Sequence, residues 1–384
     1  MQKVLLICNA DSIWTKEYVK HIHLPLSDQV EILSFEPVNA DFLQEYADMG
    51  VTIHVLKYSA HVLDKAKKIT WLLHFFYQKN RFNAYDLVEL HGPKQYGLYR
   101  LLYRLLNRYK GRLITLFHGS EILRLSPENA PALKPLLDRS TRINLQVLQL
   151  IEAFIRHYGH VYDEKIACVR LGSLAYDAID RITEDEKTLK AQFGLDPEKV
   201  IVAVGHNGYR AQQHLPVLDV LCRLDEKHKE KIQLLVHIAY GAKPGYDEEL
   251  KKKLETTGMS YVLSTQTFNL NEIARLRKAT DILIHAQLTD ALSSTIREML
   301  YAGKILVNPS WIHYHEFDSL GVQYVKYDHI DELPDLLTEL LDHRLVIDTA
   351  GNHEIMGREF SWQGLRANWN RLLQGVDETT KDEA

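Results

Sequence analysis

Short apolar runs of strand length alternate with longer amphipathic segments along the whole chain, and this alternation limits the fold more than any other feature. A sequence of strands separated by helices predicts an α/β fold with largely parallel sheets. We therefore expect Rossmann-like, doubly wound domains. The strand-like runs are residues 4–8, 30–35, 51–56, 87–90, 113–117, 143–147, 166–169, 200–204, 232–238, 260–263, 282–284, 305–307 and 322–325.

A polar stretch that ends in Gly-Leu-Asp-Pro, residues 180–199, separates the runs into two sets. It predicts two domains, which would face one another across a cleft. Ligands of open parallel sheets bind at the carboxyl ends of the strands, so the chemistry is expected in this cleft. The polar end of the chain is expected to be disordered. The expected segments are a first domain at 1–178, a linker at 179–198, a second domain at 199–356, a C-terminal helix at 357–376 and a tail at 377–384.

The composition excludes several classes of protein. The chain has 384 residues, of which 46% are hydrophobic and 25% charged, as in ordinary globular proteins. No run approaches the roughly 18 apolar residues of a membrane span, and the first run lacks the longer apolar region of a signal peptide, so we expect a cytoplasmic protein. Three distant cysteines indicate reduced, packed thiols rather than a disulfide framework or a zinc cluster.

Several sequence motifs of cofactor chemistry are missing as well. The sequence contains neither a Walker loop nor G-x-G-x-x-G, which argues against nucleotide hydrolysis and dinucleotide redox chemistry. Its histidine pairs come without further identifiable ligands, and no Asp-x-Asp follows a strand, so we expect no metal and no cofactor.

Basic residues are in excess in the first 175 residues, whereas the remainder is acidic. The positive charge concentrates in segments 65–81 and 94–112, which contain no acidic residue. In the second segment Arg100, Arg104 and Arg108 recur along one side of a predicted helix, opposite leucines. Such helices can contact an anionic membrane surface, here the inner face of the cell membrane. The alternative is a packed surface helix with solvated arginines. No motif indicates a nucleic-acid partner.

Residues 280–309 predict a βαβ unit with a polar loop at Asp290 and a helix that begins near Ser293. The free N–H groups of a helix's first turn, with the helix dipole, form an anion site that suits phosphate. The carboxylates of Asp290 and Glu298 are suited to hold hydroxyl groups. A nucleotide sugar has both features. Two alternatives stay open: the four residues from Thr295 match a capping box, and Asp is common in turns.

The spacing of Asp290 and Glu298, followed by Tyr-Ala-Gly-Lys, resembles the E-x7-E signature of glycosyltransferase family 4. The resemblance implies that Glu298 holds the donor's ribose and that Asp290 touches the transferred sugar. It also implies that Leu292, Ser293 and Ser294 hold the diphosphate. The sequence departs from the family pattern, because Asp replaces the first Glu and Ala-Leu-Ser replaces Gly-Phe-Gly.

Three further stretches resemble the same family in the expected order. Residues 193–195 (FGL) and the strand after them resemble the entry to the donor domain, and residues 115–121 (TLFHGSE) resemble a strand and His-Gly turn of the acceptor domain. Residues 360–362 (FSW) resemble the start of the helix that crosses back to the first domain in GT-B enzymes. The resemblance implies the GT-B architecture and transfer with retention, in which the departing phosphate serves as the base.

The loop after the strand 200–204 reads G-H-N-G-Y-R-A-Q-Q-H. Its glycines allow the backbone near a phosphate, and Arg210 offers a bidentate fork. The family has Arg after the glycine and Lys five residues later, where this chain has His206 and Ala211. Arg210 is therefore a displaced candidate with His214 as its helper, and an ordinary strand-to-helix turn is the alternative. The expected donor residues of this loop are Gly205, His206, Asn207, Gly208, Arg210 and His214.

The acceptor is expected on the first domain, at the carboxyl ends of its strands. The resemblance implies that His118 lies near the transferred sugar, although a histidine at a strand end is often a turn or cap residue. We assign catalysis to His118, Asp290 and Arg210. Trp311 could stack on a base or sugar, but buried packing is the favoured interpretation. The expected acceptor residues are Ser12, Trp14, Thr15, His91, Gly92, His118 and Gly119.

These features together predict a retaining, metal-independent hexosyltransferase. It would move a sugar from a nucleoside-diphosphate sugar to a glycan or lipid-linked acceptor, in cell-surface polysaccharide biosynthesis. Two other classes of protein could have the same two-domain fold. A GT-B-shaped sugar-nucleotide epimerase would isomerise the nucleotide sugar without an acceptor, and a noncatalytic two-lobed module would bind sugar or nucleotide without turnover.

Overall fold

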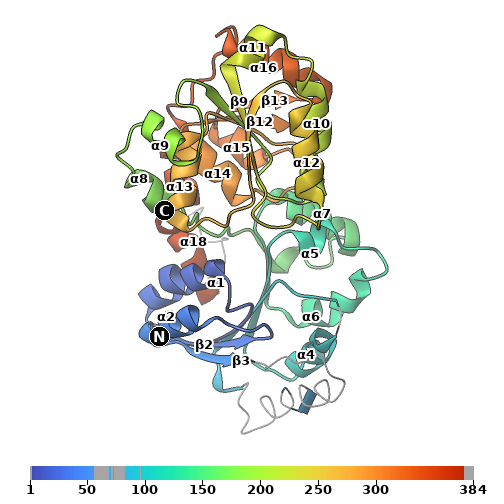
Figure 1. Cartoon of the computed structure of the whole chain (residues 1–384). Helices are drawn as coiled ribbons and strands as arrows, with labels where there is room; N and C mark the ends of the chain where they lie inside the picture. Colours follow the sequence, from blue (N-terminus) through green and yellow to red (C-terminus); the bar gives the residue numbers. More distant parts are fainter. Residues whose placement is uncertain (1, 56–68, 71, 73–82, 96, 376–384) are drawn as a thin grey trace, which may run out of the picture. The chain divides into compact units, whose positions relative to one another are not determined.

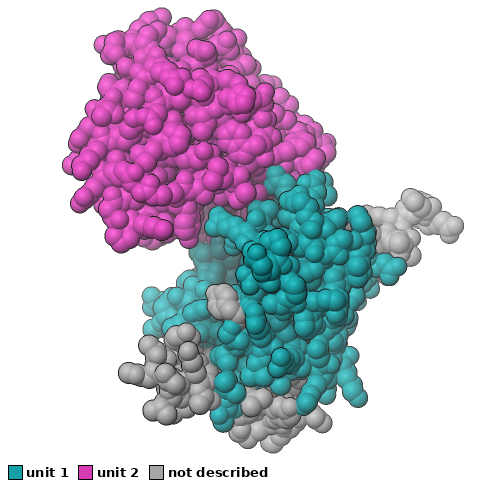
Figure 2. Space-filling model, turned by 90° about the vertical axis from the view of Figure 1, so that its right-hand side faces the viewer, with its two compact units in different colours: residues 1–172, 362–384 teal, residues 173–361 magenta. Residues whose placement is uncertain are grey.

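The computed structural model describes residues 2–55, 69–70, 72, 83–95 and 97–375. The chain divides into two compact units, which are residues 1–172 with 362–384, and residues 173–361 (Figure 2). Each unit is a parallel sheet with helices, of seven and six strands (Figure 1). The predicted α/β class with two Rossmann-like domains is confirmed.

The first unit has the strand order β3-β2-β1-β4-β5-β6-β7, and all its strand pairs are parallel. Its central strands are continuous apolar runs because both faces of the sheet are covered. The strands are β1 (Lys3–Ile7), β2 (Gln29–Ser34), β3 (Thr52–Val55), β4 (Leu87–His91), β5 (Arg112–Phe117), β6 (Arg142–Leu145) and β7 (Ile166–Ala167). The α-helices are α1 (Ile13–Tyr18), α2 (Ala40–Asp48), α4 (Leu98–Leu106), α5 (Ser120–Leu123), α6 (Lys134–Arg139), α7 (Leu148–Tyr158) and α18 (Trp362–Gln374).

The second unit has the strand order β10-β9-β8-β11-β12-β13, again all parallel. Helices cover both faces of this sheet, with α10 and α12 on one side and α13 and α14 on the other (Figure 1). The strands are β8 (Val200–Val204), β9 (Ile232–His237), β10 (Ser260–Ser264), β11 (Ile282–Ile284), β12 (Ile305–Pro309) and β13 (Val325–Tyr327). The α-helices are α8 (Tyr176–Asp180), α9 (Glu186–Gln192), α10 (His214–Leu221), α11 (Glu226–Lys231), α12 (Tyr246–Glu255), α13 (Leu270–Ala279), α14 (Ser294–Tyr301), α15 (His315–Leu320), α16 (Leu333–Leu341) and α17 (Asn352–Phe360).

Both sheets reverse their strand order at the first strand. β1 lies between β2 and β4, and β8 lies between β9 and β11. A reversal of this kind opens a crevice at the carboxyl ends of the two central strands, because the flanking connections leave toward opposite faces. The loops after β8 and β11 therefore meet in the second unit, and those after β1 and β4 meet in the first.

The C-terminal segment returns to the first unit, as predicted, but it contains two helices instead of one. α17 ends at Phe360, which is buried in the second unit against Phe317. α18 begins at Trp362 and belongs to the first unit, where Trp369 Nε1 donates to Arg170 O at 2.7 Å. The helix therefore breaks at the boundary between the two units.

The position at which the chain first passes from the first unit to the second also differs from the expected linker. The division falls after residue 172, and the residues expected as linker include α9, which packs on α13 within the second unit. A stretch that is polar in sequence can still form a surface helix whose few apolar residues are buried, as Leu189 is. The cleft between the domains stays a prediction, and the tail at 377–384 lies outside the described residues.

The structure describes only part of the two basic segments. Most of 65–81 lies outside the described residues. In 94–112, α4 buries Leu102, Leu105 and Leu106 and exposes Arg100 and Arg104. Among the described helices, none is both long and apolar enough to cross a bilayer. Membrane contact stays a prediction.

The cysteines form no disulfide among the described residues. Cys8 is buried, as expected of a packed thiol. Cys168 is exposed, so the expectation that all three thiols are packed is wrong for this residue.

Candidate functional site

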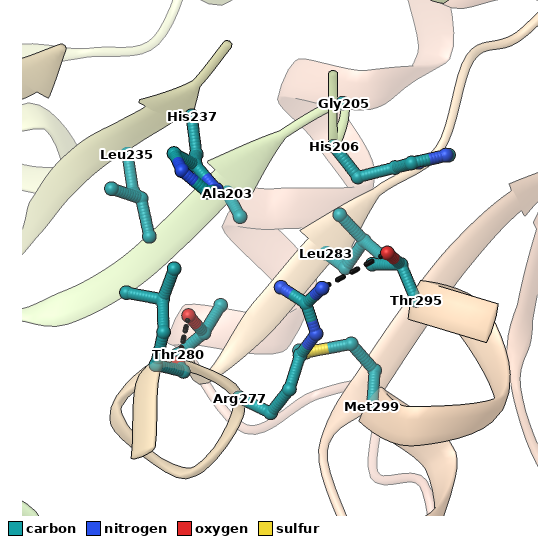
Figure 3. A pocket seen from close by; sticks show the side chains of 11 residues that line it. Ala203, Gly205, His206, Leu235, His237, Arg277, Thr280, Leu283, Thr295 and Met299 are labelled. Atoms are coloured by element: carbon teal, nitrogen blue, oxygen red, sulfur yellow. Dashed lines mark hydrogen bonds between the residues drawn. The ribbon is translucent and has the colours of Figure 1, made fainter. Parts of the chain in front are cut away.

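A pocket opens in the second unit near the carboxyl ends of β8 and β9, between these strands and helices α13 and α14 (Figure 3). Figure 3 shows Arg277 reaching from α13 toward Thr295 on α14, with His206 and His237 at the strand ends. The residues that line the pocket are Ala203, Gly205, His206, Leu235, His237, Leu276, Arg277, Thr280, Leu283, Thr295 and Met299.

Gly205 makes the turn from β8 into the loop. Its φ is +66°, and its N–H donates to Ile284 O at 3.1 Å, which ties the loop to β11. A Cβ on this residue would lie 2.6 Å from His214 Nε2, so only glycine fits. Gly208 serves a different purpose from the one expected, because a Cβ there would lie 2.6 Å from the backbone nitrogen of Ala242. It makes room for the protein's own backbone.

Arg277 and Thr295 line the pocket, and Glu298 pairs with Arg277 beside it. Arg277 Nε donates to Glu298 Oε2 at 3.0 Å, and its Nη2 donates to Thr295 Oγ1 at 3.0 Å. The Glu298 side chain is 5% exposed and that of Arg277 is 11% exposed. No side chain caps α14 among the described residues, so the structure decides against the capping-box alternative for Glu298. Glu298 is instead held from the neighbouring helix α13.

Asp290 is buried and is fixed by its own loop. Its Oδ2 accepts from Ser293 N at 2.8 Å and from Tyr314 OH at 2.7 Å. The turn interpretation of Asp290 therefore holds, and the N–H of Ser293 is already used. The first turn of α14 still offers N–H groups from Ser294 onward, because such groups have no intrahelical partner. The loop reaches this helix through Leu292, which is buried with φ +61°.

The remaining predicted donor residues flank the pocket. His206 lines it, and burial, followed by His285, Arg277 and His214, holds the pKa of its imidazole well below the ordinary value. Burial lowers the pKa of His214 to about 4. Asn207 is buried and its Oδ1 accepts from Tyr209 N at 3.0 Å, so it shapes the loop.

Arg210 is not among the residues that line the pocket. Its guanidinium pairs with Glu249, lies 4.5 Å over the ring of Tyr246 and has a side-chain exposure of 57%. The structure therefore does not bring the predicted phosphate ligand to the pocket, because a carboxylate on α12 holds it at the surface. The guanidinium that does lie in the pocket is that of Arg277.

The sequence interpretation missed Arg277. It is one of three cations near the end of α13, and the sequence pattern does not distinguish them. The structure does, because Arg275 pairs with Glu184 and Lys278 donates to Ile182 O, which leaves only Arg277 turned toward α14. These three basic residues, which directly precede the βαβ unit, were the feature of the sequence that could have indicated a phosphate ligand there.

Trp311 is exposed to 43%, so the expectation of buried packing is wrong. Its Nε1 donates to Gln287 O at 3.0 Å, and its ring meets Tyr327 edge to face at 5.5 Å. The indole is thus fixed beside the loop after β11 with a large part of its surface open to solvent.

The predicted acceptor residues of the first unit gather at the ends of β4 and β5. The rings of His91 and His118 are 5.4 Å apart, and a Cβ on Gly92 would lie 2.9 Å from Glu121 Oε1. Gly119 N donates to Glu121 Oε2 at 2.9 Å. Burial, followed by His91, lowers the pKa of His118 to about 3, and burial raises that of Glu121.

The first loop contributes less than expected. Thr15 is buried, and its hydroxyl donates to Asn9 O at 2.8 Å, so it holds the loop together. Ser12 is the N-cap residue of α1, and both it and Trp14 are partly exposed. Among the described residues, no group of three His, Cys, Asp or Glu could hold a metal ion.

Comparisons with known proteins give matches in structure but not in sequence. No family model matches the chain, and no curated protein matches it. HepE from Anabaena, solved with UDP-glucose, matches with a TM-score of 0.74 at 14% identity, over 98% of this chain and 100% of that one. A glycosyltransferase from Rickettsia africae ESF-5 matches with a TM-score of 0.75 at 12% identity, over 100% and 99%. Sucrose-phosphate synthase from Thermosynechococcus elongatus matches with a TM-score of 0.72 at 11% identity, over 98% and 99%. The chain therefore has the fold of GT-B glycosyltransferases.

Proposed function

We propose that this protein is a glycosyltransferase that moves a sugar from a nucleoside-diphosphate sugar to a hydroxyl group of a glycan or lipid-linked acceptor. The observation that carries the proposal is Arg277, which lines a pocket at the strand-order reversal and is fixed there by Glu298, in a fold that HepE uses with UDP-glucose. Membership of family 4, retention of configuration, metal independence, a cytoplasmic location and a place in polysaccharide synthesis belong to the same proposal.

The pocket offers the two kinds of partner that a nucleotide sugar needs. The diphosphate would lie between the Gly205 loop and the N-terminus of α14, where N–H groups and the helix dipole favour an anion. Arg277 uses Nε and Nη2 within the protein, and its Nη1 has no hydrogen-bond partner among the described residues, so this nitrogen can donate to a phosphate oxygen. Such fixed positive potential at the leaving group lowers the barrier to breaking the glycosidic bond.

The two carboxylates would hold hydroxyl groups. Glu298 gives one oxygen to Arg277, which leaves Oε1 for a ribose hydroxyl. Asp290 gives one oxygen to Ser293 and Tyr314, which leaves Oδ1 for the transferred sugar. Each carboxylate is therefore fixed through one oxygen and can accept from a ligand through the other.

The acceptor would bind to the first unit near His91 and His118. His118 Nδ1 lies 2.6 Å from the side-chain nitrogen of Gln146, which fixes its ring beside His91. Because burial lowers the pKa of His118, its uncharged imidazole can orient a hydroxyl group without attracting the diphosphate to the first unit.

Binding and turnover test the proposal separately. The purified protein is titrated with UDP, GDP, dTDP and CMP by calorimetry, and then with the sugar nucleotide of the preferred base. Arg277→Ala is expected to weaken binding by roughly 10- to 100-fold, the loss of a charged hydrogen bond of about 1.5–3 kcal/mol. Arg210→Ala removes the same charge at the surface and is the matched control, with an expected change of less than threefold.

The rival classes give different results. An epimerase would convert the sugar nucleotide alone to an isomer, and a binding module would bind it without releasing nucleoside diphosphate in the presence of any acceptor extract. If Arg210→Ala weakened binding more than Arg277→Ala did, the assignment of the phosphate site would be wrong.

A further inference from the structure

Four of the five exposed large apolar side chains in the second unit lie at the carboxyl edge of its sheet. The structure describes every residue of 173–361, and these five side chains are Tyr209, Tyr240, Leu288, Trp311 and Val346. All except Val346 lie in the loops that follow β8, β9, β11 and β12, which are neighbouring strands. Single exposed apolar residues are common on protein surfaces, but several at one edge indicate a surface that binds a ligand.

Hydrogen bonds join these four loops to one another in the order of the strands. The loop after β8 is bonded to the loops after β9 and β11, and the loop after β11 is bonded to the loop after β12. The bonds run from Gly208 N to Tyr240 O at 2.7 Å, from Leu288 N to Ala211 O at 2.9 Å and from Trp311 Nε1 to Gln287 O at 3.0 Å. The exposed side chains therefore belong to one connected edge, and a ligand that binds there orders little of the protein.

Trp311 presents a fixed aromatic ring at this edge. The N–H edge of the indole is turned to Gln287, and the ring of Tyr327 meets it edge to face at 5.5 Å. Since the N–H edge is occupied, an exposure of 43% includes a face of the ring. The face of an indole carries negative charge density, which attracts the weakly positive C–H groups on the face of a sugar ring.

Trp311 and Asp290 are held by the same pair of loops. Tyr314, which follows Trp311 in the loop after β12, donates to Asp290 Oδ2 at 2.7 Å. Gln287, which accepts from Trp311, donates through its side-chain nitrogen to Thr289 O at 2.6 Å. Asp290 Oδ1 has no hydrogen-bond partner among the described residues and can accept from a hydroxyl group. These two loops thus offer an aromatic face for C–H groups and a carboxylate oxygen for hydroxyl groups, and a sugar ring has both.

We propose that the open face of Trp311 stacks on the transferred sugar of the nucleotide sugar, while Asp290 Oδ1 binds a hydroxyl group of the same ring. The ligand class is a pyranose, because its ring has a face of C–H groups and a rim of hydroxyl groups. Trp311 then contributes to the affinity for the sugar and not to that for the nucleotide. This inference rests on the proposed function and names the residue that recognises the sugar.

Two substitutions at position 311 separate the aromatic face from the hydrogen bond. Trp311→Leu and Trp311→Phe both lose the indole N–H and its bond to Gln287, but only phenylalanine keeps an aromatic face. Calorimetry measures the affinity for UDP-glucose, GDP-mannose and dTDP-glucose, and for the nucleoside diphosphate of each. The tested quantity is the ratio of the two affinities for one base. In Trp311→Leu this ratio is expected to fall by roughly three- to tenfold, the loss of one stacked ring, and Trp311→Phe is expected to stay close to the wild type.

Tyr240→Leu is the matched control, because Tyr240 is an exposed aromatic residue in the loop after β9, and two strands separate β9 from β12. It is expected to keep the wild-type ratio.

Tryptophan fluorescence gives a second measurement, because Trp311 is the only tryptophan of residues 173–361. The difference between the wild type and Trp311→Phe isolates its emission. A nucleotide sugar is expected to protect Trp311 from quenching by acrylamide more than the corresponding nucleoside diphosphate does, because the sugar covers the open face of the ring.

The outcomes distinguish this inference from the proposed function. If the wild type bound none of the three nucleotide sugars, the proposed function itself would be wrong. Binding of one of them with an unchanged ratio in Trp311→Leu, or with equal acrylamide quenching for nucleotide sugar and nucleoside diphosphate, would overturn only the inference. An equal loss of affinity for both ligands in Trp311→Leu would indicate a distorted loop instead of a lost stack, and would overturn it as well. A fall of the ratio in Tyr240→Leu as large as that in Trp311→Leu would overturn the assignment to Trp311.

Discussion

Replacement of Glu89 by glutamine tests the buried charge network of the first unit. Glu89 is fully buried on β4, where its Oε1 lies 3.2 Å from His23 Nε2 and its Oε2 accepts from Tyr18 OH at 2.7 Å. His23 also pairs with Asp28 at 3.0 Å. Burial opposes ionisation of both groups, but Glu89 and Asp28 outweigh it and raise the pKa of His23 to about 9. His23 correspondingly lowers the pKa of Glu89.

The size of the effect follows from the raised pKa of His23. A rise from 6.5 to about 9 corresponds to about 3 kcal/mol of folding free energy, at about 1.4 kcal/mol per pH unit. This contribution is fully present below pH 6.5 and is lost as the pH rises through 9, because the folded state then no longer binds the extra proton. At pH 7 about 2.5 kcal/mol is present. Since Asp28 remains in Glu89→Gln, the expected loss is about 2 kcal/mol.

Urea unfolding followed by tryptophan fluorescence measures this difference at pH 7 and pH 9.5. Thermal unfolding of a unit of this size is expected to shift by roughly 4–8 °C at pH 7. At pH 9.5 the two proteins are expected to converge, because neutral His23 no longer compensates the buried carboxylate. Glu36→Gln is the control, because Glu36 pairs with Lys94 at the surface and should contribute less than about 1 kcal/mol. An equal destabilisation by Glu89→Gln at both pH values would refute the reasoning.

Three further substitutions probe the turn, the loop and the returning helix. Gly205→Ala forces a side chain to φ +66° and against His214, so we expect a loss of about 1–3 kcal/mol in urea unfolding and weaker nucleotide binding by calorimetry. Tyr314→Phe removes one donor to Asp290, and we expect a loss of about 1 kcal/mol with slower sugar transfer at unchanged nucleotide affinity. Trp369→Leu removes a fully buried indole, and we expect a loss of about 3 kcal/mol and faster release of the C-terminal segment in limited proteolysis.

The fold could be predicted from the sequence because its strands are buried on both faces and therefore read as continuous apolar runs. The run at 200–204 coincides with β8. The last run, 322–325, is displaced from β13 for a physical reason. Val322 N donates to Phe317 O across Gly321, which has φ +75°, and this is the Schellman arrangement at the end of α15. A residue that is apolar because it covers a helix end cannot be told from a strand residue by pattern.

The site was predictable only where its residues share one local segment. Asp290 and Glu298 belong to one loop and the helix after it, so their spacing indicates a common site. Arg277 reaches Glu298 from another helix, and Glu249 reaches Arg210 from α12. Both pairs depend on how helices pack against the sheet, which the sequence does not encode in its local spacing.

The structure differs from the sequence interpretation at Arg210 and at Arg277. Both differences concern the positive charge that is available to a diphosphate. The sequence pattern places that charge on Arg210 in the glycine loop, but Glu249 neutralises it at the surface. Arg277 replaces it in position but not fully in charge, because Glu298 already compensates its guanidinium. Arg277 and Glu298 together therefore carry no net charge. The N–H groups in the first turn of α14 and the dipole of this helix would therefore have to supply the remaining positive potential for a diphosphate.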